Sequence, residues 1–571
     1  MRHLYLFYLL LMINGLHSQN FEWVKAFGGL GNQHINDIVI DSFDNVYVFG
    51  DFENTVDFNA SPEETFNLTS IEGYNAFLAK YDSDGNFLWA EQIESSYLID
   101  IDKVVISANS ILVVGGFIGS VNFQTETETI ALNSPSKNKM FLAKYNLDGN
   151  LQWVKYWGNS TAHIGARDVV IDSQNNIHIC GHYGDGVLRP NTNSNTPAFS
   201  AIQDKGFWIE IDESGNYLDS KTFGDPNNSW YTYDRVQSIK FDDFGNSIIT
   251  GNFRGSFDFD FSSEETIVQS HENGSNFIAK YHSTGSLLWV KNVDLIEPND
   301  LQLDSNNDIY TTGKFYGTVD VDLSPNSEYI LSAPASYYDN YLLKLNEDGN
   351  FTWAFSFGGN YGPADNSRSV LISGNNLLIA GSVSFEGDID FDPDPNSDFL
   401  IPVNNLSDVF LAKYNTDGEF SWAFTLSGDQ GLSSASQANK VVLDNQGKVY
   451  AIGTFNSTVD FDPGNEQYNI TSIDEQDMFL MKLDGNLLSV EEETITNSIK
   501  LYPNPVNDYL YLDSESQIKS LVMYDLTGKI IFERNKPAYN VEINLKELTR
   551  STFFIKISTE QGEFWKKILK Q

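Results

Sequence analysis

The sequence predicts an all-β protein in which a seven-bladed β-propeller with four-stranded blades precedes a small β-sandwich. Three observations lead to this fold class. The phrase FLAKYDSDGNFLW at residues 77–89 returns in close or degenerate copies, each copy follows two further alternating runs, and the copies are evenly spaced. Their turn glycines lie 64 to 70 residues apart, at Gly85, Gly149, Gly215, Gly285, Gly349, Gly418 and Gly485. Repeats of this length are typical of propeller blades, which become stable by stacking on their neighbours.

Each repeat supplies two hairpins. Apolar residues alternate at Phe77, Ala79 and Tyr81, and an Asp/Gly/Asn turn leads to a second run that ends at Trp89. Residues 37–50 contain an earlier pair of alternating runs around the turn SFDN. Alternation with a period of two, interrupted by such turns, is the pattern of β-hairpins. We expect the Asp-Ser-Asp-Gly-Asn segment to be a hairpin turn and not a calcium loop, because no Glu follows at the distance that such a loop requires.

The two ends of the repeat region complement each other. Residues 20–28 match residues 150–158, the last strand of a repeat, but no first three strands precede them. The final copy of the phrase, at residues 479–489, has lost its Trp. If the N-terminal strand completes the last blade, the ring closes without an open sheet edge. This arrangement gives the prediction of seven blades over residues 19–489.

The N-terminus has the pattern of a secretory signal peptide, which we assign to residues 1–18. Arg2 precedes an apolar run from Leu4 to Ile13, and the small residue Ser18 follows. Elsewhere the apolar runs fall short of the roughly 20 residues that a membrane helix needs, so we expect no transmembrane segment in the mature chain. Cys180 is the single cysteine, which excludes an intrachain disulfide.

Charge is distributed unevenly along the chain. The formal net charge is −43, but residues 499–571 hold 11 Lys and Arg against 9 Asp and Glu, so the acidic excess belongs to the propeller. An acidic surface repels nucleic acid and anionic membranes, and we expect neither as a partner. The polar residues 490–498 are interpreted as a linker between the propeller and the C-terminal domain, residues 499–571.

The C-terminal segment contains LYPNP at residues 501–505, VMYDLTGK at 522–529 and WKKILK at 565–570. These ordered motifs resemble the type A C-terminal sorting domain of the bacterial type IX secretion system. The resemblance implies Sec export followed by type IX transport, with the secretion machinery as partner and the cell surface or the extracellular space as destination. The residues that carry the signal are Tyr502, Pro503, Asn504, Pro505, Tyr524, Asp525, Gly528, Lys529, Lys566, Lys567 and Lys570.

The repeats themselves, through residues 41–50 and 77–85, resemble the SBBP family of β-propeller repeats. That resemblance implies a fold but no activity.

One face of the ring is the candidate working surface. In a four-stranded blade, the connections between the second and third strands and between blades share one face, and here these connections are long. Binding residues concentrate on such loops, so we expect a glycan or protein ligand at this long-loop face. Its connections carry closely spaced aspartates that favour a solvated strand edge, with calcium binding as the alternative. The calcium candidates are Asp320, Asp322, Asp390, Asp392, Asp394, Asp460 and Asp462.

Two other patterns favour packing over binding. His178, Cys180 and His182 share one face of a strand and form a conceivable metal site, but other repeats place ordinary packing residues at the first two positions. The repeated tryptophans are likewise interpreted as packing residues and not as a sugar-binding platform.

The function predicted from these observations is a non-catalytic binding or adhesion module, because the scattered histidines form no recognisable catalytic constellation. An alternative is a polysaccharide lyase or glycosidase that uses paired carboxylates. Another alternative is a purely structural surface component. Residues 79–89 are also similar to the tryptophan-docking motif of pyrroloquinoline-quinone dehydrogenases, but the Asp-to-Gly spacing is one residue shorter and the paired cysteines typical of those enzymes are impossible. We predict no cofactor other than possible calcium.

Overall fold

A computed structural model divides the chain into two compact units, Met1–Leu488 and Ser489–Gln571. It describes residues 21–484 and 499–570 apart from residues 62, 71–72, 108, 126, 159–161, 192–197, 225–233, 263, 273, 325–326, 335–336, 360–364, 385–386, 404, 429–435, 465, 475, 503–505, 507–508, 526–528, 547, 549–550 and 560–562. The predicted signal peptide and linker lie outside these residues. Regular structure is entirely β in the described part, which contains no helix long and apolar enough to cross a membrane.

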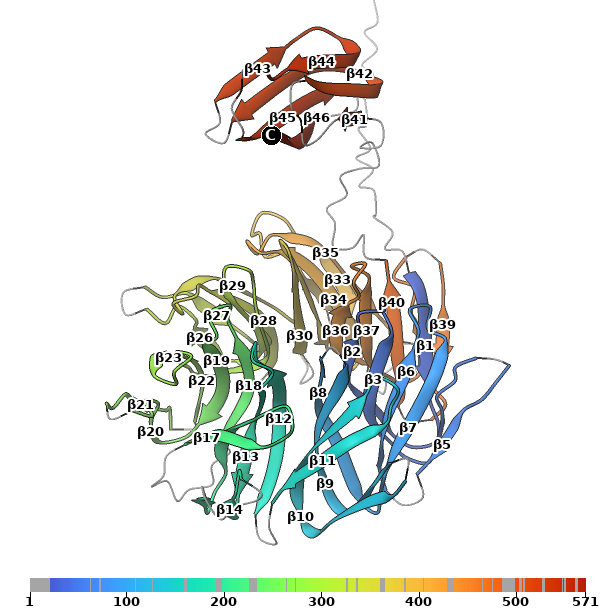
Figure 1. Ribbon diagram of the computed structural model, residues 1–571, viewed down its shortest axis with the longest axis vertical. Coiled ribbons are helices and arrows are strands. Elements are labelled where there is room, and N and C mark those ends of the chain that lie inside the picture. The colour runs from blue at the N-terminus through green and yellow to red at the C-terminus, as the bar shows by residue number, and fades with distance from the viewer. Residues whose placement is uncertain are drawn as a thin grey trace, which may run out of the picture. The chain divides into compact units, whose positions relative to one another are not determined.

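The larger unit is a β-propeller whose four-stranded sheets follow one another around a ring (Figure 1). The first repeat forms β2 (Gln33–Ile40), β3 (Val46–Phe52), β6 (Asn75–Tyr81) and β7 (Phe87–Ser95). Later repeats form β12 (His163–Ile171), β13 (Ile177–Gly184), β16 (Lys205–Ile211) and β17 (Tyr217–Phe223); β18 (Arg235–Phe241), β19 (Ser247–Phe253), β22 (Ser275–Tyr281) and β23 (Leu287–Val293); β24 (Ile296–Leu303), β25 (Ile309–Tyr316), β28 (Tyr338–Leu345) and β29 (Phe351–Phe357); and β30 (Asn366–Ser373), β31 (Asn376–Val383), β34 (Asp408–Asn415) and β35 (Phe420–Leu426).

The second repeat differs from the others. Its strands β8 (Leu98–Ser107), β9 (Ser110–Gln124), β10 (Thr129–Asn146) and β11 (Leu151–Trp157) include two unusually long ones. The extended β9 also pairs with β7, at Glu94 with Asn122 and Ser95 with Val121, so two successive blades merge into one eight-stranded sheet. The repeat pattern did not predict this extension.

The other repeats carry a short outer hairpin in the connection between their second and third strands. The hairpins are β4 (Thr55–Asp57) with β5 (Asn67–Thr69), β14 (Gly186–Leu188) with β15 (Phe199–Ala201), β20 (Ser256–Asp258) with β21 (Ile267–Gln269), β26 (Thr318–Asp320) with β27 (Ile330–Ser332), β32 (Gly387–Asp390) with β33 (Leu400–Val403), and β38 (Thr458–Asp460) with β39 (Asn469–Thr471). They form the long loops that the sequence places on one face.

The N-terminal strand closes the ring. Strand β1 (Phe21–Phe27) pairs antiparallel with β40 (Asp477–Leu483), next to β37 (Val449–Phe455) and β36 (Gln437–Leu443). In Figure 1 the blue β1 lies beside the orange β40. An ion pair of 2.6 Å between Lys448 Nζ and Glu22 Oε1 strengthens the join. The two chain ends of the propeller thus complete one sheet, as expected from their sequences.

Five blades hold a neighbour through the lysine of the repeated phrase, whereas the β12–β17 blade has Glu210 at that position. The Nζ atom of Lys80 donates to the carbonyl of Leu147 at 3.2 Å, in the turn between the third and fourth strands of the next blade. Lys482 closes the circle by donating to Ser83 O at 2.8 Å. Equivalent bonds join Lys144 to Glu213 O, Lys280 to Glu347 O and Lys344 to Thr416 O. We call these five bonds the lysine clamps.

The repeated tryptophans pack beside these clamps. A Cβ atom added at Gly149 would lie 3.0 Å from the ring of Trp89 in the preceding blade. The same contact joins Trp23 to Gly85, Trp289 to Gly349 and Trp353 to Gly418. These glycines adopt positive φ angles, 76° at Gly85 for example, which fits the hairpin turns predicted there. The tryptophans therefore have the packing role that the sequence indicates.

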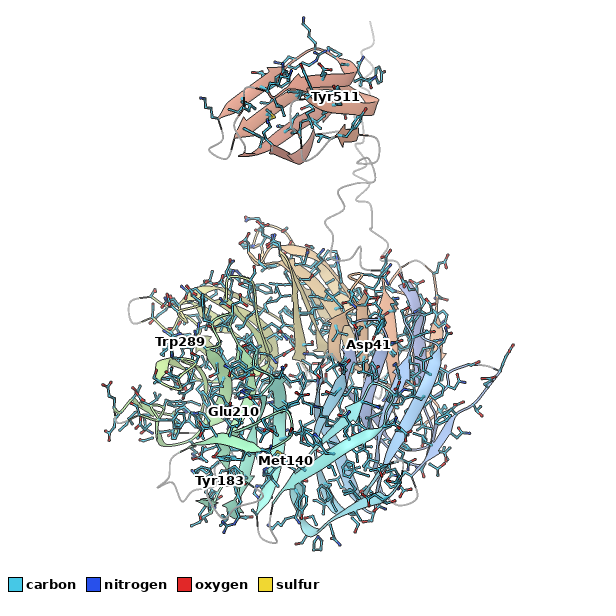
Figure 2. The ribbon with its side chains drawn as sticks, viewed as in Figure 1. Asp41, Met140, Tyr183, Glu210, Trp289 and Tyr511 are labelled. Atoms are coloured by element: carbon cyan, nitrogen blue, oxygen red, sulfur yellow. The ribbon has the colours of Figure 1, made fainter. Side chains whose placement is uncertain are left out.

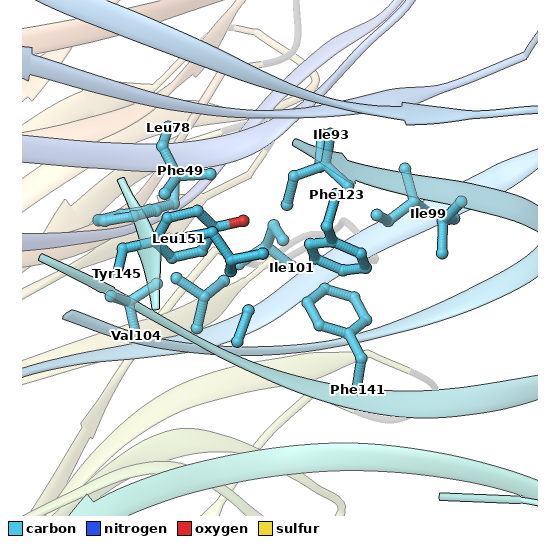
Figure 3. Packing of buried hydrophobic residues seen from close by; sticks show 14 of the residues in the cluster. Phe49, Leu78, Ile93, Ile99, Ile101, Val104, Phe123, Phe141, Tyr145 and Leu151 are labelled. Carbon is cyan, nitrogen blue, oxygen red and sulfur yellow. The ribbon is translucent and has the colours of Figure 1, made fainter. Parts of the chain in front are cut away.

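Apolar side chains fill the spaces between blades. Phe49 and Leu78 of one blade pack with Val104 and Tyr145 of the next, in a continuous buried cluster (Figure 3). Comparable clusters lie between the later blades and across the ring closure. Because each sheet buries both faces, its stability depends on its neighbours.

A backbone bulge in every innermost strand explains a repeated glycine. The register shifts by one residue between the first and second strands of each blade, for example between Pro298 and Asp300. A Cβ atom on the facing glycine would lie 1.9–2.3 Å from a backbone carbonyl of the innermost strand. The glycines concerned are Gly50, Gly115, Gly181, Gly251, Gly313, Gly381 and Gly453.

The smaller unit is an all-β domain around the long strand β42 (Tyr509–Asp525). β42 pairs with β41 (Ile499–Tyr502) and β44 (Ala538–Asn544) along its first half, and with β43 (Ile530–Arg534) and β45 (Ser551–Thr559) along its second. Strand β46 (Glu563–Lys570) pairs with β45. Leu510, Met523 and Ile555 belong to its own buried core.

Two carboxyl groups are buried close together at the start of β28 and beside the start of β30. Asp339 and Asp365 are 7% and 1% exposed, and a Cβ atom at Gly358 would lie within 2.6 Å of an oxygen of each. The pKa of both groups is raised to about 7, chiefly by burial and, for Asp339, also by the charge of Asp365. The folded state therefore retains protons on these carboxyl groups at pH values where an unfolded aspartate is ionised.

Replacing Gly313 by Ala tests the bulge geometry. The new methyl group would lie 2.0 Å from Glu297 O, so we expect a loss of about 3 kcal/mol or a proportionate drop in the urea midpoint. The matched variant Gly317→Ala, where φ is 72° and no atom lies within 4 Å of the added carbon, should lose only about 1 kcal/mol. Equal losses in the two variants would contradict the steric argument.

The buried acid pair predicts that stability falls as pH rises. Between the unfolded pKa near 4 and the folded pKa of about 7, the folded state binds more protons, so the stabilisation present below pH 4 is lost as pH rises through 7. Asp339→Asn should raise the melting temperature at pH 8 by about 2 °C or more and change it little at pH 5. The exposed control Asp348→Asn should leave the melting temperature unchanged at both pH values. An equal shift of Asp339→Asn at both pH values would refute the prediction.

Candidate functional site

A cavity of about 700 Å³ opens on the long-loop face, between the β18–β23 blade and the β24–β29 blade. Strand ends supply its walls: β18 begins at Arg235, β25 ends with Lys314 and Tyr316, and β28 begins at Tyr338. The other charged residues of the lining are Arg254 in the loop after β19, Glu297 of β24, and Asp234 just before β18. The cavity therefore lies on the face that the loop lengths predict.

Cross-strand pairs organise the polar side chains of this cavity. Arg235 Nε donates to Asn252 Oδ1 at 2.8 Å, and Lys314 Nζ lies 3.4 Å from Glu297 Oε2. Lys314 also lies 4.3 Å from the centre of the Tyr338 ring. The Tyr338 ring is 5.9 Å from that of Tyr316. Two aromatic rings and several cationic groups thus face one space in an otherwise acidic chain.

Deeper in the ring, a belt of paired charges joins the innermost strands. Lys440 Nζ lies 2.7 Å from Asp300 Oδ2 although their blades are not neighbours, so the belt crosses the centre of the ring. Lys103 pairs with Asp37 at 3.7 Å and Lys240 with Asp168 at 3.5 Å. Burial opposes ionisation of Asp300, but the surrounding lysines hold the pKa of its carboxyl below the usual value. These groups have the arrangement of a structural network, because each charge has a partner.

The candidate calcium ligands lie in three separate outer hairpins. Asp390 Oδ1 accepts hydrogen bonds from the backbone of Asp392 at 3.0 Å and of Phe399 at 2.9 Å. Asp320 and Asp460 accept two backbone bonds each in the same way. The remaining candidates, Asp322, Asp392, Asp394 and Asp462, each cap a backbone N–H group two residues further on. Their visible role is to close the hairpin loops.

Among the described residues, two groups of three His, Cys, Asp or Glu side chains bring their ligand atoms within 4.8 Å of one another. They are His163 with His182 and Asp204, and Asp172 with His178 and Glu210; none of the calcium candidates belongs to either. Calcium binding stays a prediction.

The histidines expected to share one strand face belong to different groups. His178 is buried, its Nδ1 accepts a bond from Trp208 Nε1 at 3.0 Å, and its Nε2 lies 3.1 Å from Asp172 Oδ2. Figure 2 labels Glu210, the third member of that group. Cys180 is fully buried in an apolar cluster and joins neither group. The packing interpretation of Cys180 is therefore confirmed.

His182 lies at the opposite end of β13, on the long-loop face. Burial lowers the pKa of its imidazole to about 4, and the positive charge of Arg167 contributes. The pKa of His163 is raised, chiefly by its hydrogen bond to Asp204. The two rings lie 5.9 Å apart. The sequence alone did not group these residues, because they come from three different strands and loops.

The structure places the sorting residues on several strands of the smaller unit. Tyr502 ends β41, Tyr524 and Asp525 end β42, and Lys566, Lys567 and Lys570 lie on β46. Lys529 precedes β43, whereas Pro503, Asn504, Pro505 and Gly528 lie outside the described residues. A parallel bridge between Val506 and Lys570 brings the first and last motifs together.

Replacing Asp390 by Ala should destabilise its hairpin by about 1–2 kcal/mol, because two backbone N–H groups lose their acceptor. Melting curves of the full chain, with EDTA and then with millimolar CaCl₂, measure the loss. The neighbouring Asp388→Ala, an exposed residue of the same hairpin, should have little effect. Wild-type stabilisation by CaCl₂ that Asp390→Ala abolishes would show that these carboxylates hold calcium and do not act only as hairpin caps.

Comparisons with known proteins agree with the division into two units. Residues 500–571 match the family model described as the secretion system C-terminal sorting domain. The uncharacterized WD repeat-containing protein L264 of Acanthamoeba polyphaga mimivirus is 23% identical over 533 residues, which cover 78% of this chain. This chain spans 37% of that relative's length.

Solved structures with similarity include the Dos1 propeller, with 8% identity, 81% of this chain and 96% of that chain covered, and a TM-score of 0.37. Another is PorZ, a surface component of the type IX secretion system of Porphyromonas gingivalis, with 10% identity, coverage of 94% and 81%, and a TM-score of 0.23. The C-terminal match confirms the sorting-domain resemblance. Residues 500–571 therefore belong to the secretion system C-terminal sorting domains, and the chain is exported by type IX secretion to the cell surface or the extracellular space.

Proposed function

We propose that the propeller is a binding module that presents its long-loop cavity to acidic glycans outside the cell. The observation that supports this most is the local reversal of charge. In a chain with a formal net charge of −43, the lining of one cavity of about 700 Å³ holds three cationic residues, Arg235, Arg254 and Lys314, against two carboxylates, Asp234 and Glu297. That volume lies within the range of small-ligand sites.

The cavity offers the two kinds of contact that a charged sugar needs. Guanidinium groups match carboxylates with two parallel hydrogen bonds. The rings of Tyr316 and Tyr338 supply apolar faces with hydroxyl groups at their edges. Burial, followed by the charge of Glu297, raises the pKa of the Tyr338 hydroxyl, so this group stays a hydrogen-bond donor at neutral pH. A glycan that carries carboxylate groups fits this combination.

Export supports a role for this cavity in the extracellular environment. The sorting domain delivers the chain to the cell surface or the extracellular space, where acidic polysaccharides are accessible. Glu297, a carboxylate in the cavity lining, is paired with Lys314, which favours a binding role over acid catalysis. We therefore propose recognition without turnover.

Calorimetric titration with uronic acid oligosaccharides tests this function. Lys314→Ala and Tyr338→Ala should each weaken binding by about 10- to 100-fold, equivalent to about 1.4–2.8 kcal/mol. Tyr156→Ala is a matched control, because Lys139 lies 5.6 Å from that ring in a similar pair outside the cavity lining. The affinity of the Tyr156→Ala variant for the oligosaccharides should be unchanged. Failure of the wild-type chain to bind any of the acidic oligosaccharides, or their cleavage by it, would contradict the proposal.

A further inference from the structure

Two imidazoles and one carboxylate meet at the long-loop end of the β12–β17 blade. His163 begins β12, His182 lies near the end of β13, and Asp204 immediately precedes β16. One ligand atom of each lies within 4.8 Å of the others, and His163 Nε2 is 2.7 Å from Asp204 Oδ1. The backbone of three strands therefore fixes the group.

The strand register sets His182 apart from its counterparts in three other blades, although Asp100 of the second repeat likewise faces a glycine, Gly116. His182 pairs with Gly165, which has no side chain. At the same register, His34 pairs with Asp51 and Arg235 pairs with Asn252, and both pairs form side-chain hydrogen bonds. In a third blade, Glu297 and Lys314 form an ion pair. His182 thus lacks the cross-strand polar partner that these positions have.

The imidazole of His182 has an unused nitrogen. Its Nδ1 atom is buried and has no hydrogen-bond partner, which is costly for a polar atom unless another interaction compensates. Glycines make room around the group: a Cβ atom at Gly165 would lie 2.4 Å from the His182 ring, and one at Gly184 would lie 2.4 Å from Asp204 Oδ1. The side chains of the group pack directly against these glycines, and the unsatisfied nitrogen lies among them.

The second three-residue group provides an internal contrast. In the group of Asp172, His178 and Glu210, both nitrogens of His178 have partners, Trp208 Nε1 and Asp172 Oδ2. Asp172 also accepts two backbone hydrogen bonds in its own turn. The histidine of that group is satisfied without an ion, whereas His182 is not.

We propose that His163, His182 and Asp204 bind a divalent transition metal ion, with zinc the expected species. Two histidines and a carboxylate form a ligand set suited to zinc and related first-row ions, with coordination positions left for water or a ligand. Ligand atoms of tetrahedral zinc lie about 3.3 Å apart at bond lengths of about 2.0 Å. The ligand atoms of the three residues lie within 4.8 Å of one another, and His163 Nε2 and Asp204 Oδ1 are 2.7 Å apart.

The surroundings suit such a site. Asp185 Oδ2 lies 3.8 Å from His163 Nδ1, on the nitrogen opposite the one that faces Asp204. A carboxylate at that position orients a metal-bound imidazole. Arg167 and Arg235 lie near enough to affect His182, and their charge favours an anionic ligand at an open position of the ion.

Titration of the metal-free full-length protein with Co²⁺ tests the site. We expect one equivalent to bind, with visible absorption bands of a four- or five-coordinate nitrogen and oxygen site, and Zn²⁺ to displace it. His163→Ala, His182→Ala and Asp204→Asn should each weaken binding by more than about 100-fold, since loss of a supporting partner alone costs about 10- to 100-fold. Asp185→Asn, which removes only the supporting carboxylate, should weaken binding by about 10- to 100-fold.

Two controls separate the site from general histidine binding. His178→Gln removes the histidine of the satisfied group, and His271→Ala removes one outside both groups; each should retain the Co²⁺ spectrum and affinity. Circular dichroism melts without metal check that the ligand variants fold, and Asp204→Asn is the most conservative of them. Absence of Co²⁺ and Zn²⁺ binding to the wild type, retention in His182→Ala, or equal loss in His178→Gln would overturn the proposal.

Discussion

The lysine clamp is the interaction on which the rest of the propeller depends. A blade buries both faces only against its neighbours, and the ammonium group of the third strand fixes the spacing by donating to the next blade's turn. The tryptophan that ends the same phrase packs on the glycine of that turn. Lys482 reaches the turn of the first blade, so the same type of bond also holds the ring closure. The repeated phrase thus supplies an inter-blade contact in most of the repeats.

The lysine clamps lie at the short-loop face. The residues at the opposite, long-loop face are therefore free to differ between blades. There the strand ends carry different polar pairs in successive blades: His34 with Asp51, Arg235 with Asn252, Glu297 with Lys314. The cavity of about 700 Å³ occupies this variable end. The proposed glycan and metal sites both lie at this variable end, because a scaffold stabilised at one face tolerates residue substitutions at the other.

Several sequence predictions agree with the structure for direct physical reasons. Alternation of apolar residues, turn residues and an incomplete final repeat predicted the strands and the closure by residues 21–27, which pair with β40. The acidic motifs did not distinguish calcium binding from loop capping, because closely spaced aspartates serve equally for both. In the structure Asp390 accepts backbone N–H groups from across its own loop, at Asp392 and Phe399. Only the folded hairpin shows where those carboxylates point.

The repeat, the all-β class and the sorting domain could be predicted from the sequence, because all three depend on local patterns and short motifs. Tertiary structure alone decided which residues meet. His182 looked like a neighbour of His178 in sequence, but a strand rises about 3.3 Å per residue and carries the two to opposite ends of the blade. There each finds different partners, Asp172 for His178 and His163 for His182. Strand register, which no local pattern specifies across blades, set those contacts.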